Sequence, residues 1–283
     1  MKQIIRVTIL VLGLTALTAT IAEANEIPET IAKDHVRIES AQGVGLNSIG
    51  LKVIQELAAA IPTVKSYFLL SWKNLIRNDE LVVDSYNRIH HFGRWVNDKR
   101  DQGCQNTRAK ILVRDSKVPV VFKSNSECTV ESGQWNDPYT KTVLTDAVSE
   151  VQVDHLVPLK NAYISGAHAW DYQTRCLYAN YLGSNYHLKP IDAPENMKKS
   201  DGTPARYMPA NKEYRCTYIK NWLLVKMVWN LEMTHKEATA IKEIIAEENC
   251  NPQQFQITQG EITEQQKFFK NNLALCPKTP PTE

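Results

Sequence analysis

Six cysteines constrain the fold of this chain more than any other feature of its sequence. The number is even, and no two of the cysteines form a Cys-x-x-Cys pair, so neither a zinc ribbon nor a thioredoxin-like redox site is expected. In an exported chain this pattern predicts three structural disulfides. A bridge between Cys104 and Cys128 would close a short, loop-rich segment. The full set is Cys104, Cys128, Cys176, Cys216, Cys250 and Cys276.

Residues 1–24 have the features of an export signal. Lys2 and Arg6 give a positive start, and an apolar run extends over residues 7–19. Ala22-Glu23-Ala24 then supplies the small residues that a signal peptidase needs. The apolar run is shorter than the about 20 residues of a membrane span, so we expect cleavage after Ala24 rather than an uncleaved anchor. The mature protein is then expected to be secreted or periplasmic and to have no membrane segment.

The charge of the chain is nearly balanced, with a formal net charge of +2. This excludes a protein that coats nucleic acid by bulk positive charge, so any nucleic-acid contact must come from a local basic patch. The sequence also has no His-Glu-x-x-His, no phosphate-binding glycine loop and no Gly-x-Ser-x-Gly. Protease, nucleoside-triphosphatase and esterase activities therefore have no support.

The chain is expected to consist of the signal, an appendage, one larger domain and a tail. Residues 25–85 carry apolar residues at helical spacing but no motif with chemistry, which predicts a helical appendage whose protein partner is unknown. Residues 86–276 contain all the cysteines and form the larger domain. The Pro-rich segment 277–283 is expected to be a disordered tail.

Within the larger domain, short strands and helices are expected first and long helices later. Alternation over residues 151–157 predicts a strand that Pro158 ends, and Ser132-Gly133 predicts a turn. The other expected elements are a helix that starts at Asn106, a strand over 117–123, a helix over 170–182, a strand over 187–191, a helix that starts at Asn196, and helices over 213–272 with a capping box at Thr234 to Glu237.

Asp154 and His155, at the end of the strand predicted over 151–157, are the chief candidates for catalysis. Hydrolysis of a phosphodiester needs a general base to activate water, and a neutral His is suited to this because its pKa lies near neutral pH. Adjacent residues of a strand point to opposite faces, so both side chains can serve one site only where the strand bends into its loop. An isolated Asp-His pair is more often structural than catalytic, so the surrounding pattern decides.

Asn196 completes a candidate metal site. The reaction needs a cation to neutralise the phosphate and the leaving oxygen. A carboxylate from Asp154 and an amide oxygen from Asn196 form a hard, open oxygen site, which suits Mg²⁺ or Mn²⁺. The pair His90-His91 has no Cys, Asp or Glu at ligand spacing, so we expect surface or core histidines there.

The stretch Val153-Asp154-His155-Leu156-Val157-Pro158-Leu159 resembles the Asp-His-hydrophobic-hydrophobic-Pro signature of HNH endonucleases. Over residues 86–250 the chain resembles more closely the secreted HNH family related to the C-terminal domain of GmrSD-type restriction enzymes. The resemblance does not extend to residues 25–85. It is carried, in order along the chain, by Phe92-Gly93-Arg94-Trp95, residues 103–108, residues 133–139, Ser165-Gly166-Ala167 with Trp170, residues 178–182, residues 196–201, Pro204-Ala205, and Cys216-Thr217-Tyr218 with Trp222 and Lys226.

The resemblance implies an α+β fold in which a ββα-metal (HNH) core lies within a larger, mostly helical, disulfide-stapled domain. It implies that His155 is the general base and that Asp154 and Asn196 bind one divalent ion. The middle Asn of the motif orients the base. Asn180 matches the family at this position, whereas Asn185 fits the spacing of plainer HNH motifs.

The resemblance also bears on the disulfides. Cys216 and the region of Cys250 match the family pattern, which implies a bridge between them. Cys176 and Cys276 then remain for the third disulfide. The expected pairing is therefore Cys104–Cys128, Cys216–Cys250 and Cys176–Cys276.

The implied function is a secreted endonuclease that hydrolyses DNA, with RNA as the alternative substrate. Lys199 could contact phosphate or lie on a solvated helix face, and Arg175 and Arg206 are further phosphate-binding candidates. The rival hypothesis is a non-catalytic secreted binding protein or effector on the same scaffold. The intact set of Asp154, His155 and Asn196 favours the enzyme.

Overall fold

The computed structural model describes residues 6–9, 17–20, 75–77, 85–98, 100 and 103–280, and the chain divides into two units, 1–56 and 57–283. In the first unit, β1 (Arg6–Ile9) pairs antiparallel with β2 (Leu17–Thr20). These strands lie within the predicted export signal, which stays a prediction. The helical segments predicted within 25–85 lie outside the described residues, except that Ile76 belongs to the strand β3 (Ile76–Arg77).

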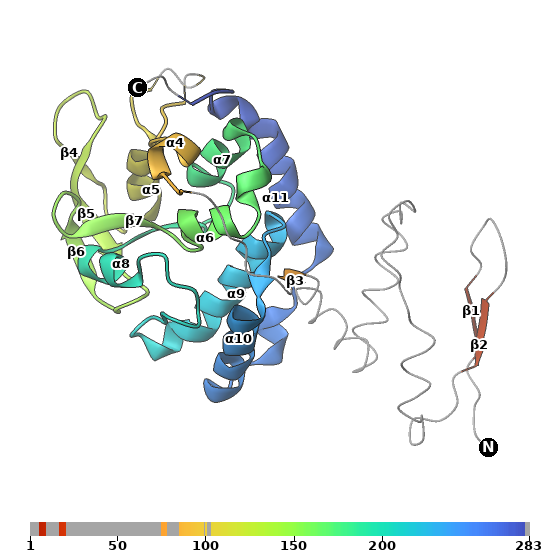
Figure 1. Ribbon diagram of the computed structural model, residues 1–283. Coiled ribbons are helices and arrows are strands. Elements are labelled where there is room, and N and C mark those ends of the chain that lie inside the picture. Colours follow the sequence, from red (N-terminus) through yellow and green to blue (C-terminus); the bar gives the residue numbers. More distant parts are fainter. Residues whose placement is uncertain are drawn as a thin grey trace. The chain divides into compact units, whose positions relative to one another are not determined.

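The second unit contains short sheets and a group of helices (Figure 1). It combines helices with small sheets, which agrees with the expected mixture of α and β structure. Its strands are β3, which pairs parallel with β9 (Met233–Thr234), the antiparallel sheet β4 (Val121–Phe122), β5 (Val130–Asn136) and β6 (Val143–Asp146), and the antiparallel pair β7 (Val151–His155) and β8 (Leu188–Asp192). Its helices are α4 (Arg88–Phe92), α5 (Thr107–Asp115), α6 (Leu159–Ile164), α7 (Tyr172–Ala179), α8 (Ala193–Lys199), α9 (Lys212–Val228), α10 (His235–Glu247) and α11 (Gln259–Asn272), with 3₁₀ turns at Ala167–Ala169, Pro252–Phe255 and Leu273–Leu275.

Two hydrophobic cores meet at β7. Val151 and Val153 belong to the smaller core, which also contains residues of α5, β5, β6 and β8. Leu156 and Val157, directly after the strand, belong to the larger core between α6, α7 and the long helices α9 to α11. The chain passes from the smaller core to the larger core within a few residues, because Pro158 stops the strand and serves as the N-cap of α6. The end of β7 is therefore held from both sides.

Three disulfides join these elements in the predicted pairing. Cys104–Cys128 links the segment before α5 to the segment before β5, and Cys216–Cys250 links α9 to the segment after α10. Cys176–Cys276 links α7 to the C-terminal segment. Each bridge is expected to stabilise the fold by about 2–4 kcal/mol.

The predicted turn at Ser132-Gly133 is wrong, because both residues lie within β5. A Cβ on Gly133 would come within 2.7 Å of the ring of Trp135, and the strand register shifts between Ser132 and Trp135. The glycine is therefore needed for a close approach at a bulge, which is the other common use of glycine in a strand.

The helix that carries Asn196 starts earlier than predicted. Asp192 caps α8 by accepting from the backbone N–H of Glu195, and Pro194 follows in the first turn. This is a standard N-terminal arrangement, and it moves Asn196 into the body of the helix. The helix predicted over 170–182 is also shorter, since Asp171 caps α7 and Asn180 ends it.

The capping box predicted at Thr234 to Glu237 is half formed. The Thr234 side chain accepts from the backbone N–H of Glu237, but the Glu237 carboxylate turns inward. It accepts from Trp222 Nε1 at 2.7 Å and pairs with the buried Lys226 at 3.4 Å. Trp222 in α9 and Trp229 at the C-terminal end of this helix are both buried.

Candidate active site

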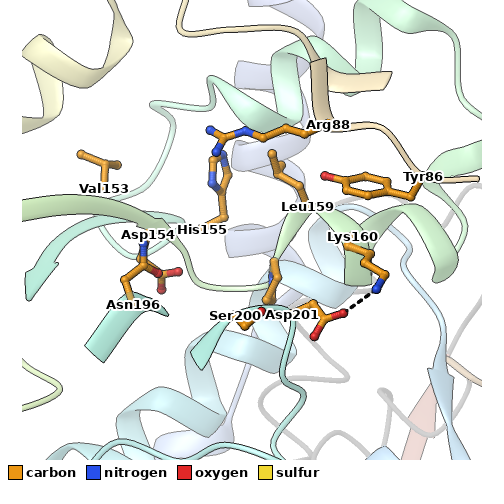
Figure 2. Close-up of a pocket in the computed structure, with 11 residues that line it drawn as sticks. Tyr86, Arg88, Val153, Asp154, His155, Leu159, Lys160, Asn196, Ser200 and Asp201 are labelled. Carbon is orange, nitrogen blue, oxygen red and sulfur yellow. Dashed lines mark ion pairs between the residues drawn. The ribbon is translucent and has the colours of Figure 1, made fainter. Parts of the chain in front are cut away.

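The end of β7 places Asp154 and His155 in one pocket. They are the last two residues of the strand and pair with Lys189 and Leu188 of β8. The pocket has a volume of about 350 Å³, and its lining includes Arg88, Asp154, His155 and Asn196 (Figure 2). The sequence hypothesis requires that two adjacent strand residues reach one site, and both residues line this pocket.

A backbone carbonyl fixes the tautomer of His155. Nε2 lies 2.9 Å from the carbonyl oxygen of Ala179, the last residue of α7. Because a carbonyl can only accept, Nε2 carries the proton and Nδ1 carries the lone pair. Nδ1 has no hydrogen-bond partner among the described residues. The side chain thus offers one nitrogen as a proton acceptor.

Aromatic and charged neighbours set the state of His155. Its ring stacks on Trp95, and the ring of His187 lies edge-on at 6.4 Å between centroids. Burial lowers the pKa of His155 well below its usual range, and the nearby His187 and Arg88 act in the same direction, while the bond to Ala179 opposes them. His155 is therefore neutral at neutral pH, which is the form that accepts a proton.

Both carboxylate oxygens of Asp154 are held by buried side chains. Lys199 Nζ donates to Oδ1 at 2.7 Å, and Tyr139 Oη donates to Oδ2 at 2.8 Å. Lys199 also donates to the carbonyl oxygen of His155 at 2.9 Å. Burial raises the pKa of Asp154, and the positive charge of Lys199 opposes this shift. Burial also raises the pKa of Tyr139 well above its usual range, so its hydroxyl stays a donor.

Asn196 reaches the same pocket from α8. Its Nδ2 donates to Gln152 Oε1 at 2.8 Å, and Gln152 lies on the same face of β7 as Asp154. This bond leaves Asn196 Oδ1 without a partner among the described residues. An amide oxygen and a carboxylate therefore lie in one pocket, as the sequence predicts.

The oxygen atoms of Asp154 and Asn196 fit a hard divalent cation. A carboxylate oxygen has two lone pairs, so each oxygen of Asp154 keeps one beyond its bond to Lys199 or Tyr139. Within the part of the chain that the structure describes, no three His, Cys, Asp or Glu side chains are grouped to hold a metal ion. An ion bound here would have few protein ligands and would keep coordination positions for water and phosphate. This coordination is typical of Mg²⁺.

Neither predicted substrate-binding residue presents its charge to the pocket. Lys199 is 1% exposed, and its ammonium group pairs with Asp154 instead of facing solvent. The guanidinium of Arg175 donates to three backbone carbonyls, those of His91, His168 and Trp170. Arg206, the further candidate, is exposed and lies 3.4 Å from Asp201 at the edge of the pocket.

Asn180 follows Ala179, the residue that holds His155, but its own side chain makes no hydrogen bond to His155. The bond that orients His155 comes from Ala179, one residue earlier. The buried Asn180 side chain instead accepts from the backbone N–H of Val96 at 3.0 Å and donates to the carbonyl oxygen of Arg94 at 3.2 Å. Asn185, the alternative, is exposed.

Sequence reasoning missed four groups that shape the site. Trp95 and Tyr139 lie in segments that carry the family resemblance, and this was the available signal for them. The Ala179 carbonyl has no side-chain signal at all. Arg88 precedes the matching segments and lines the pocket without any motif to mark it.

Fold and site together define a disulfide-bonded α/β protein with a buried Asp-His pair at a strand end. Residues 107–244 match the profile of the GmrSD restriction endonucleases, C-terminal domain. The chain is 36% identical over 162 residues to an uncharacterized secreted protein of Arthroderma benhamiae, covering 57% of this chain and 75% of the relative. No solved structure matches the chain.

The chain belongs to the family of the C-terminal domain of GmrSD restriction endonucleases. This is a nuclease family, and restriction endonucleases are usually metal-dependent. Among the described residues, we find no helix with both the length and the apolar character needed to cross a bilayer.

Proposed function

We propose that this protein is a secreted, metal-dependent endonuclease that hydrolyses phosphodiester bonds of DNA. In this proposal β7, β8 and α8 are the two strands and the helix of an HNH-type ββα-metal core. The observation that carries the proposal is the state of His155. It is neutral, its Nε2 is held by Ala179, and its Nδ1 is free in a pocket that also contains Asp154 and Asn196.

In the proposed mechanism, His155 Nδ1 accepts a proton from the attacking water. The Ala179 carbonyl keeps the ring in the productive tautomer and stabilises the imidazolium that forms. A divalent ion held by Asp154 and Asn196 would neutralise charge on the scissile phosphate and on the leaving oxygen. A general base of this kind contributes about 10²–10⁴-fold to the rate.

Other side chains around the pocket hold Asp154, His155 and Asn196 in position. Lys199 and Tyr139 fix the Asp154 carboxylate, and Gln152 fixes the amide of Asn196. Asn180 acts as a positioning residue, because its bonds to Arg94 and Val96 hold the segment beside Trp95. Lys199 therefore has a structural and electrostatic role in place of a direct phosphate contact.

Digestion of supercoiled plasmid DNA by the purified protein tests the proposal. We expect nicking and linearisation with Mg²⁺ or Mn²⁺, no cleavage with a chelator, and recovery when excess metal is restored. An RNA substrate run in parallel decides between the two nucleic acids. Failure to cleave DNA or RNA with any divalent ion would reject the enzyme and favour the binding-protein hypothesis.

We also propose that the protein is exported from the cell before it cleaves nucleic acid. The relative is named as a secreted protein, and three disulfides are typical of an oxidising compartment. The predicted cleavage after Ala24 is checked by the mass of the exported chain. A mature chain that still begins at Met1 would reject it.

A further inference from the structure

A second hollow lies beside the catalytic pocket. It has a volume of about 380 Å³ and is lined by Arg88, Ile89, Gly93, Arg94, Trp95 and Asn106. Arg88 also lines the catalytic pocket, so this residue stands between the two spaces. Trp95 stacks on His155, so the hollow adjoins the proposed general base directly.

The backbone that forms this hollow is fixed by its sequence. Gly93 ends α4 with a φ of 74°, and a Cβ there would come within 2.5 Å of Tyr172 Oη. Only glycine can make this turn without strain. The segment that follows is then anchored by Asn180, through the backbone of Arg94 and Val96. Arg94 and Trp95 are therefore presented on a rigid segment.

The two arginines of the hollow differ from the other arginines whose side chains the structure describes. Arg88 and Arg94 are exposed, and neither has a carboxylate or carbonyl partner among the described residues. The Arg88 guanidinium lies 5.9 Å from the centre of the Trp95 ring. The other arginines each donate to a carboxylate or to backbone carbonyls: Arg100, Arg108, Arg114, Arg175, Arg206 and Arg215.

The lining of the hollow contains no Asp or Glu. Two unpaired guanidinium groups therefore create a local positive field in a chain whose net charge is only +2. Guanidinium groups match the geometry of phosphate oxygens, and such contacts hold a nucleic-acid strand in register without reading its bases. Among the described residues neither guanidinium has a hydrogen bond or an ion pair, and the contact of Arg88 with the Trp95 ring leaves its N–H groups without an acceptor.

We propose that Arg88 and Arg94 form a phosphate-binding subsite that holds the phosphodiester backbone of the DNA strand beside the scissile bond. The proposal rests on the proposed function. Because the net charge of the chain is nearly balanced, nucleic-acid binding needs a local basic patch, and the proposal identifies Arg88 and Arg94 as this patch. Arg94 gives the sharper test, because it lines the second hollow and not the catalytic pocket.

The test compares Arg94→Gln with the wild-type protein on two substrates, a DNA duplex and a small chromogenic phosphodiester that cannot reach the hollow. We expect kcat/KM to fall about tenfold on DNA, and by much less on the small diester. The slope of log KM against log salt concentration on DNA should weaken by about one. Arg94→Lys, which keeps the charge, should recover part of the loss. Arg100→Gln is the matched control, because Arg100 is exposed but already paired with Asp98, and it should behave as wild type.

The failure of this proposal can be told apart from failure of the proposed function. If the wild-type protein cleaves DNA and Arg94→Gln matches it in kcat/KM and salt slope, the subsite is rejected and the nuclease stands. If the wild-type protein cleaves no phosphodiester, the subsite is tested by measuring the binding of a fluorescein-labelled DNA duplex to His155→Ala. Weaker binding when Arg94→Gln is added supports the subsite, and equal binding or no binding at all rejects it.

Discussion

The indole ring of Trp95 lies parallel to the imidazole ring of His155, with 5.3 Å between the ring centroids and an angle of 4° between the planes. Two constraints therefore act on the proposed base. Ala179 holds the Nε2 edge of the ring, and Trp95 holds one face. A base fixed in this way can accept a proton from the attacking water in only one geometry. Holding reacting groups in the correct geometry lowers the barrier to the reaction.

Replacement of Trp95 by Leu should lower kcat and leave KM for a small phosphodiester nearly unchanged. An aromatic pair contributes about 0.5–1.5 kcal/mol beyond its buried area, so its loss should slow the chemical step by roughly three- to tenfold. Trp95→Phe, which keeps a ring to stack, should retain most of the rate. The measurement is steady-state kinetics at saturating metal.

Trp170→Leu is the control for this experiment. Trp170 is also half-buried and packs against Trp229, but it lies outside the pocket that contains Asp154 and His155. Its replacement should lower stability without changing kcat. Equal kcat values for Trp95→Leu and the wild-type protein would show that the stack does not position the base.

Lys199→Met should destabilise the fold by about 3–5 kcal/mol, because it leaves the carboxylate of Asp154 buried without its positive partner. Lys198→Met is the matched control. Lys198 is the neighbouring residue on α8, but its side chain is 64% exposed and lies 3.5 Å from Glu195, so the change should be below about 0.5 kcal/mol. Urea unfolding measures both. Similar values for the two variants would contradict the buried ion pair.

Stability should fall as the pH falls from about 6.5 towards 4. His187 is 2% exposed, and burial lowers its pKa to about 4, whereas an exposed His has a pKa of about 6.5. In this window the unfolded chain binds a proton at His187 and the folded chain does not, so acid favours unfolding. The free energy of unfolding should decrease by about 3 kcal/mol from this residue alone.

The check is urea unfolding of the wild-type protein and of His187→Gln across this pH window. The variant should be less stable at neutral pH but should show a flatter pH dependence. Some slope should remain, because burial also lowers the pKa of His155. An unchanged slope in His187→Gln would contradict the assignment.

The parts of the fold predicted from sequence are those that local pattern decides. Alternation followed by Pro158 gives the strand β7 and its end, and the Asn106 cap gives the start of α5. The turn predicted at Gly133 is wrong because the sequence does not distinguish a glycine in a turn from a glycine packed under an aromatic ring. Which of the two applies depends on where Trp135 packs, and that is a tertiary fact.

The sequence identifies pocket residues whose side chains carry a motif, and it does not identify those whose position depends on packing. Asp154, His155 and Asn196 share one pocket, as their residue types and motif indicate. Lys199 follows Lys198 on an apparently polar helix, and no local signal tells the buried lysine from the exposed one. The group that orients His155 is a backbone carbonyl, which any residue at position 179 would supply.

Whether His155 is the general base is decided by the single-turnover rate of DNA cleavage by His155→Ala at saturating Mg²⁺ or Mn²⁺. We expect a rate about 10²–10⁴-fold below wild type, and no recovery with more metal, because the ion does not replace the base. Asp154→Ala and Asn196→Ala should instead recover partly as metal is raised. His90→Ala, an exposed histidine outside the pocket, should cleave like the wild-type protein. Wild-type rates in folded His155→Ala would contradict the account.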